Sequence, residues 1–228
     1  MSNEKKQTEQ ESLQLITSMI QKAKASYHDK GISAILWGVT IAIASLLSYL
    51  QIELNFDFPF DPFLLIIVAI VFQIYISVKE SKLNKVTKHE DAAINAVWLT
   101  YGISILGLVA YINIVPNVSA QLSKQEGWEF VKHYINNTKP DEILSPFVLS
   151  SYSLFILLYA FPTLVTGITK KFVPMIVGAI LAYVFFIISC FTALKFDLLL
   201  GALAAIVCWL IPGIILRRKF LKLRNNNV

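Results

Sequence analysis

The chain has 228 residues, of which 56% are apolar and only 15% are charged, against about 45–50% and about 25% in ordinary soluble domains. This composition excludes a disordered or collagen-like chain and argues against a soluble enzyme with an ordinary polar surface. The net charge of +5 fits binding either to nucleic acid or to an anionic membrane. The positions of the basic residues decide between these two partners.

The first pattern along the chain predicts an amphipathic helix over residues 8–27. Thr8 and Glu11 have the spacing of a capping box, and apolar side chains then recur every three or four residues. Such a helix can lie on the inner membrane surface, or it can dock on the cytoplasmic ends of a helix bundle or on a partner. The residues that we expect to make this membrane-surface or partner contact are Leu13, Ile16, Met19, Ile20 and Tyr27.

Six apolar stretches without Asp, Glu, Lys or Arg follow this segment. A helix needs about 20 such residues to cross a membrane. Asp61-Pro62 and Ser145-Pro146 have the pattern of helix starts, while Pro116 should end the third helix and Gly167 should help to end the fourth. The sequence therefore predicts an all-α membrane bundle of six transmembrane helices, at about residues 32–51, 59–79, 92–114, 146–168, 172–194 and 197–216.

The long outer loop 115–145 contains a second helix candidate. Ser123 and Glu126 have capping spacing, and Trp128, Val131 and Ile135 would then share one face. Aromatic residues of this kind gather at the level of the lipid headgroups, so a short interfacial helix is the simple interpretation. A recognition loop is the alternative, because long loops are often functional.

The basic residues predict the orientation of the chain. Sixteen of the twenty Lys and Arg residues lie in segments on one side of the predicted spans, namely 1–31, 79–91, 170–171 and 217–228. Cytoplasmic loops carry such an excess, so both termini should be cytoplasmic, and the chain divides into an N-terminal segment 1–31, a transmembrane domain 32–216 and a basic tail 217–228. Basic residues near helix ends suit anionic headgroups, and we expect the lipid bilayer, not nucleic acid, as the partner.

The predicted spans carry no ionisable residue in their central parts, whereas proton relays and catalytic sites in membranes depend on such residues. The chain also lacks HExxH, GxSxG and GxxxxGK[ST] motifs, so we expect no catalytic residue, cofactor or metal. Gln73 and Asn95 could make intramembrane polar contacts, and an interhelical hydrogen bond is favoured over a substrate path. Cys190 and Cys208 lie in apolar runs and should be buried thiols.

Small residues recur at every fourth position in four of the predicted spans. Such spacing lets two helix backbones approach closely. We therefore expect helix packing at Ala34/Gly38/Ala42, Ala92/Ala96/Thr100/Ser104, Gly178/Ala182 and Gly201/Ala205.

The stretch 12–38 resembles a family of small uncharacterised multi-pass membrane proteins from bacteria. The resemblance rests on the amphipathic helix, with Lys22 and Lys24 beside its apolar residues, and on Leu36-Trp37-Gly38 in the first span. The resemblance implies the bacterial inner (plasma) membrane. It points to no particular activity, so it assigns no functional residues. The predicted topology is also similar to that of permease subunits of ABC-2-type exporters. In that family, however, the outer insertion lies between the fifth and sixth helices, whereas here the long outer loop follows the third.

These observations favour a non-enzymatic inner-membrane protein that acts through packing or through contact with a partner, either a second copy or another membrane protein. The alternative is the membrane subunit of a transporter. Its substrate would be apolar or uncharged, because the span centres carry no charge.

Overall fold

The computed structural model describes residues 14, 30–83, 89–136, 139–143 and 151–225. In chain order its elements are α2 (Ile32–Leu54), the 3-10 turn η1 (Pro62–Leu64), α3 (Leu65–Leu83), α4 (His89–Gln125), β1 (Val131–Lys132), β2 (Glu142–Ile143), α5 (Ser151–Thr169), α6 (Val173–Ser189), α7 (Leu194–Ala205), the π-helical segment η2 (Ile206–Leu210) and α8 (Ile211–Asn225). The predicted contact residues Leu13, Ile16, Met19, Ile20 and Tyr27 lie outside the described residues, as does Ser145-Pro146.

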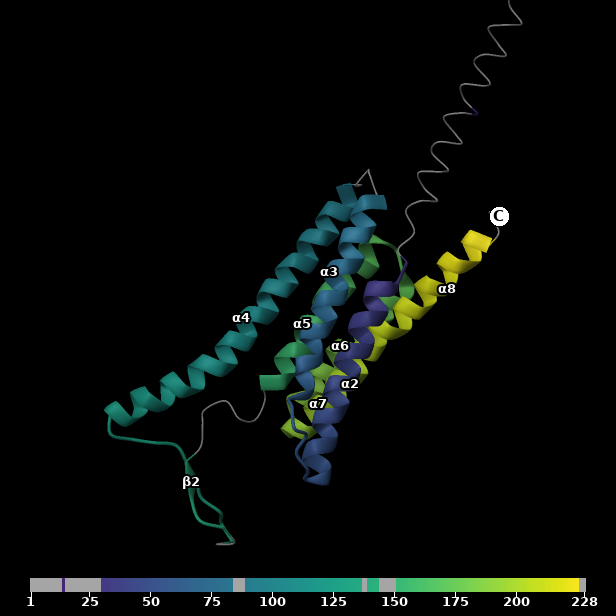
Figure 1. Ribbon diagram of the computed structural model, residues 1–228. Helices are drawn as coiled ribbons and strands as arrows, with labels where there is room; N and C mark the ends of the chain where they lie inside the picture. The colour runs from purple at the N-terminus through teal and green to yellow at the C-terminus, as the bar shows by residue number, and fades with distance from the viewer. Residues whose placement is uncertain (1–13, 15–29, 84–88, 137–138, 144–150, 226–228) are drawn as a thin grey trace, which may run out of the picture.

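The helices form an elongated bundle from which α4 diverges along its length (Figure 1). The compact part consists of α2, α5, α6 and the continuous helical run α7–η2–α8, which pack on one another, while α3 lies against α2 and α4 against α5. Among the described residues, five helices are long and apolar enough to cross a membrane, and α6 is a shorter apolar helix. The structure thus confirms a mostly helical bundle of apolar helices.

Small residues allow the closest helix contacts. At Gly38 a Cβ atom would lie 2.5 Å from the backbone nitrogen of Leu210, and at Gly178 it would clash with the carbonyl oxygen of Val207. At Gly201 a Cβ would have the hydroxyl of Ser45 within van der Waals distance. Three of the predicted small-residue stripes therefore lie at helix contacts. The stripe on α4 differs, because Ala92, Ala96 and Thr100 are exposed.

The prediction that the third helix ends near Pro116 is wrong. Helix α4 continues through Pro116 to Gln125 and has 37 residues. Proline removes one backbone hydrogen bond, but two asparagines beside it add others: Asn113 Nδ2 donates to the carbonyl of Val109 at 2.8 Å and Asn117 Nδ2 to that of Asn113 at 3.1 Å. These bonds reinforce the helix where the proline weakens it.

The predicted interfacial helix after Ser123 is also wrong. Ser123 lies inside the last turns of α4, and Gly127 then takes a positive φ of 85° that ends the helix. Val131 belongs to the first strand of a short antiparallel hairpin, in which Val131 pairs with Ile143 and Lys132 with Glu142. The apolar spacing that suggested a helix instead places Trp128 and Val131 on an exposed hairpin.

The structure also differs from the predictions for Gly167 and Cys190. Gly167 does not cap α5, because Lys171 takes the positive φ of 50° there. Gly167 instead allows α6 to approach, since a Cβ at Gly167 would lie 3.0 Å from the Cβ of Met175. Cys208 is buried as predicted, but Cys190 is exposed at the end of α6, and both thiols are free.

Candidate polar sites in the helix bundle

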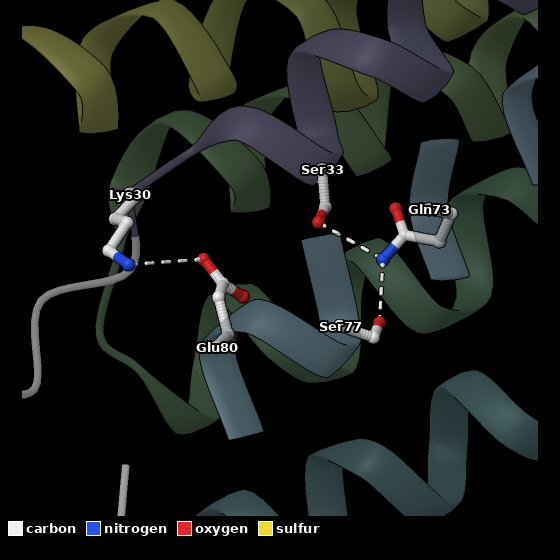
Figure 2. A network of polar contacts seen from close by, with 5 residues as sticks. All are labelled: Lys30, Ser33, Gln73, Ser77 and Glu80. Atoms are coloured by element: carbon white, nitrogen blue, oxygen red, sulfur yellow. Dashed lines mark hydrogen bonds and ion pairs between the residues drawn. The ribbon is translucent and has the colours of Figure 1, made fainter. Parts of the chain in front are cut away.

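Gln73 is the centre of a hydrogen-bond network between α2 and α3 (Figure 2). Its Oε1 accepts a hydrogen bond from Trp37 Nε1 at 3.2 Å, and its Nε2 donates to Ser33 Oγ at 3.1 Å and to Ser77 Oγ at 3.2 Å. The amide thus uses both its donor and its acceptor groups within the protein. Gln73 therefore joins α3 to α2 by hydrogen bonds, and this leaves less capacity for a substrate.

The polar contacts of α2 and α3 continue to one end of the bundle. Lys30 Nζ lies 3.8 Å from Glu80 Oε1, seven residues beyond Gln73 on α3 (Figure 2). Both side chains are partly exposed, so the ion pair contributes little to stability. The other predicted polar residue, Asn95, is exposed on α4, and the structure does not bring it into the Gln73 network.

The most buried charged group in the described part of the chain is Asp197, in the first turn of α7. Its side chain is 0% exposed. Thr192 Oγ1 donates to Asp197 Oδ1 at 2.7 Å, whereas no donor reaches Oδ2 among the described residues. Asp197 was not predicted as a site residue because it is the first residue of the predicted sixth span. It was therefore grouped with the polar residues that flank the spans. No capping pattern marked it in the sequence, because the N-cap of α7 is Ala193, which makes no side-chain cap bond.

An aromatic cluster fills the middle of the bundle. Trp209, on the π-helical segment η2, is 2% exposed, and its ring centroid lies 4.9 Å from Tyr159, 6.1 Å from Tyr101 and 6.3 Å from Trp98. Trp209 Nε1 donates to Thr163 Oγ1 at 2.9 Å. The rings pack against one another, so this cluster is a packed core rather than a binding cage.

The β1–β2 hairpin carries two exposed polar pairs. His133 Nδ1 lies 2.8 Å from Asp141 Oδ1, and Tyr134 donates to Glu142 Oε2 at 3.1 Å. A side-chain hydrogen bond with Tyr134 raises the pKa of Lys132. These pairs hold the two strands in register at the end of a loop that stands away from the bundle (Figure 1).

In the described part of the chain, no three His, Cys, Asp or Glu side chains gather where they could hold a metal ion. Comparisons with protein-family models, with curated proteins and with solved structures found no match. A function must therefore be inferred from the residues themselves. The structure contains a satisfied polar network between α2 and α3, a buried carboxylate at the start of α7, and a long helix, α4, that few other helices cover.

Proposed function

We propose that the chain is a non-enzymatic protein of the bacterial inner membrane, which it crosses six times with both termini in the cytoplasm. Its role would be to hold a membrane-spanning helix of a partner against α4. The observation that carries this proposal is an uncovered stripe of small residues on α4. The apolar window of α4 is only 6% buried, against 11% for Pro62–Glu80, 44% for α5 and 50% for the run α7–η2–α8.

Lipid can cover exposed apolar side chains, but the small residues of α4 favour a helix. Ala92, Ala96 and Thr100 follow one another at four-residue intervals and are exposed. The same spacing in α2 and α6 is covered by the run α7–η2–α8, where Gly38 meets Leu210 and Gly178 meets Val207. Since small residues let helix backbones approach closely, the uncovered stripe on α4 is suited to a further helix.

The topology can be tested with reporter fusions. Fusions after Lys88, after Lys139 and at Val228 should report cytoplasm, outside and cytoplasm, because the basic residues cluster in alternate segments. A fusion after Asp57, in the link between α2 and η1, should report outside. An outside signal at Val228 would contradict the six-span topology.

The partner contact can be tested by photo-crosslinking in intact membranes. A photo-crosslinking amino acid at Ala96 or Thr100 should give a discrete protein adduct, because the small face of α4 would touch the partner. The matched control is Ile180, which is 53% exposed on α6 but outside the small-residue stripe of that helix. An adduct twice the 25.7 kDa mass of the chain would identify the partner as a second copy. Equal adducts from Ala96 and Ile180, or none from Ala96, would contradict the proposal.

A further inference from the structure

The turn between α6 and α7 brings several oxygen atoms together around Asp197. Thr192 Oγ1 lies 2.7 Å from Asp197 Oδ1 and 3.4 Å from the carbonyl oxygen of Ser189. Ser189 and Asp197 are both fully buried. A carboxylate, a hydroxyl and a carbonyl at one turn are the oxygen ligands that hard cations prefer.

The charge of Asp197 lacks a partner among the described residues. The nearest basic residue along the chain is Lys195, but its Nζ is committed to Glu53 Oε2 at 3.0 Å. Hydrogen bonding is incomplete as well, because Thr192 reaches only Oδ1 and no described donor reaches the buried Oδ2. The partial positive charge at the start of α7 offsets only part of the carboxylate's charge. A buried carboxylate without a full partner is unfavourable unless a cation or a proton joins it.

We propose that Asp197, Thr192 and the Ser189 carbonyl form a binding site for a monovalent metal cation such as Na⁺. One carboxylate balances one positive charge, and no group of three or more His, Cys, Asp or Glu residues in the described part of the chain would suit a divalent metal. Hard oxygen ligands and a single charge together favour an alkali cation. This site is independent of the proposed partner contact, because it lies on α6 and α7 and not on α4.

The position of the site gives the cation a structural effect. Ser189 ends α6, Thr192 lies in the following turn and Asp197 lies in the first turn of α7. The cation would therefore fasten two consecutive helices at their connection. Cys190 and Phe191, in the same turn, are exposed, so the turn itself lies at the surface of the bundle.

The test uses the full chain purified in detergent micelles, with thermal unfolding followed in NaCl and in choline chloride at equal ionic strength. Na⁺ should raise the Tm of the unmodified chain by about 2–4 °C and saturate, because only the folded state holds the site. The substitution D197N should remove this response, since asparagine can still accept from Thr192 but carries no charge. The substitution T192V should move the response to higher Na⁺ concentrations.

The matched control is E80Q, which breaks the partly exposed ion pair with Lys30, involves no residue of the proposed site, and should keep the full Na⁺ response. Line broadening in ²³Na NMR gives a second readout, which the unmodified chain should show and D197N should lose. Equal Tm values in NaCl and choline chloride would overturn the proposal. A Tm that depends on pH through Asp197 but not on Na⁺ would also overturn it, because a proton and not a metal cation would then neutralise the carboxylate.

Discussion

Replacement of Gly178 with leucine should prevent the bundle from forming a stable native state. Gly178 lies on α6 where the π-helical segment η2 crosses it, and a Cβ atom there would clash with the carbonyl oxygen of Val207 and lie 3.3 Å from the Cα of Cys208. Both neighbours are backbone atoms, so they cannot move aside as a flexible side chain does. The contact also includes Cys208 Sγ, 3.6 Å from the carbonyl oxygen of Gly178, and separating the helices would lose it.

Overpacking in a core typically costs about 1–3 kcal/mol, and a clash with backbone places Gly178→Leu at or above the upper end of this range. Size-exclusion chromatography and thermal unfolding in micelles measure the loss of stability. The matched control is Gly102→Leu on α4, where a Cβ meets nothing within 4 Å and leucine improves helix propensity. If both variants were equally stable, the close approach of α6 and η2 would be refuted.

Truncation of Trp209 to alanine should produce the second large effect. The indole is almost fully buried among Trp98, Tyr101 and Tyr159, and its N–H bonds to Thr163. Removal of a buried tryptophan costs about 3–5 kcal/mol. Trp209→Phe keeps most of the apolar volume and loses the hydrogen bond, so it should cost less, about 1 kcal/mol for the lost bond plus a packing change.

Unfolding of the purified variants by heat or denaturant in micelles provides the measurement. Trp128→Ala is the control, because Trp128 is 47% exposed on the hairpin and makes its hydrogen bond to the exposed Glu126. The free energy of unfolding of that variant should be within about 0.5 kcal/mol of the value for the unmodified chain. If Trp128→Ala lost as much stability as Trp209→Ala, the core of the bundle would not lie around Trp209.

The helical segments could be predicted because their signal is long and local. Each apolar run is many residues long and lacks charge, so small errors at its ends do not change the assignment. The interhelical bond of Gln73 was predictable in kind, since an amide within an apolar helix needs a partner. Its actual partners, Ser33, Trp37 and Ser77, follow from the register of α2 against α3, which the sequence does not specify.

The local predictions were wrong where a contact or a neighbouring residue in the fold overrides a rule drawn from local sequence. Pro116 ends many helices, but Asn113 and Asn117 supply hydrogen bonds that sustain α4. Trp128, Val131 and Ile135 fit a helical spacing, yet Gly127 ends the helix before them. Asp197 stood at a predicted boundary and was therefore treated as solvated, whereas the turn after α6 buries it completely. Burial of one side chain depends on tertiary contacts and is weakly encoded in local sequence.

The length of α4 would have a consequence in a bilayer, which the proposed function assigns to this chain. Its 37 residues extend about 55 Å, whereas the hydrocarbon core is about 30 Å thick. It packs mainly on α5, and Trp98 and Tyr101 also contact Trp209 of η2. A helix that is longer than the membrane is thick, and that packs on the bundle along only part of its length, can respond to a thinner bilayer by tilting. Since the hairpin follows the end of α4, such a tilt would change the position of the hairpin relative to the membrane.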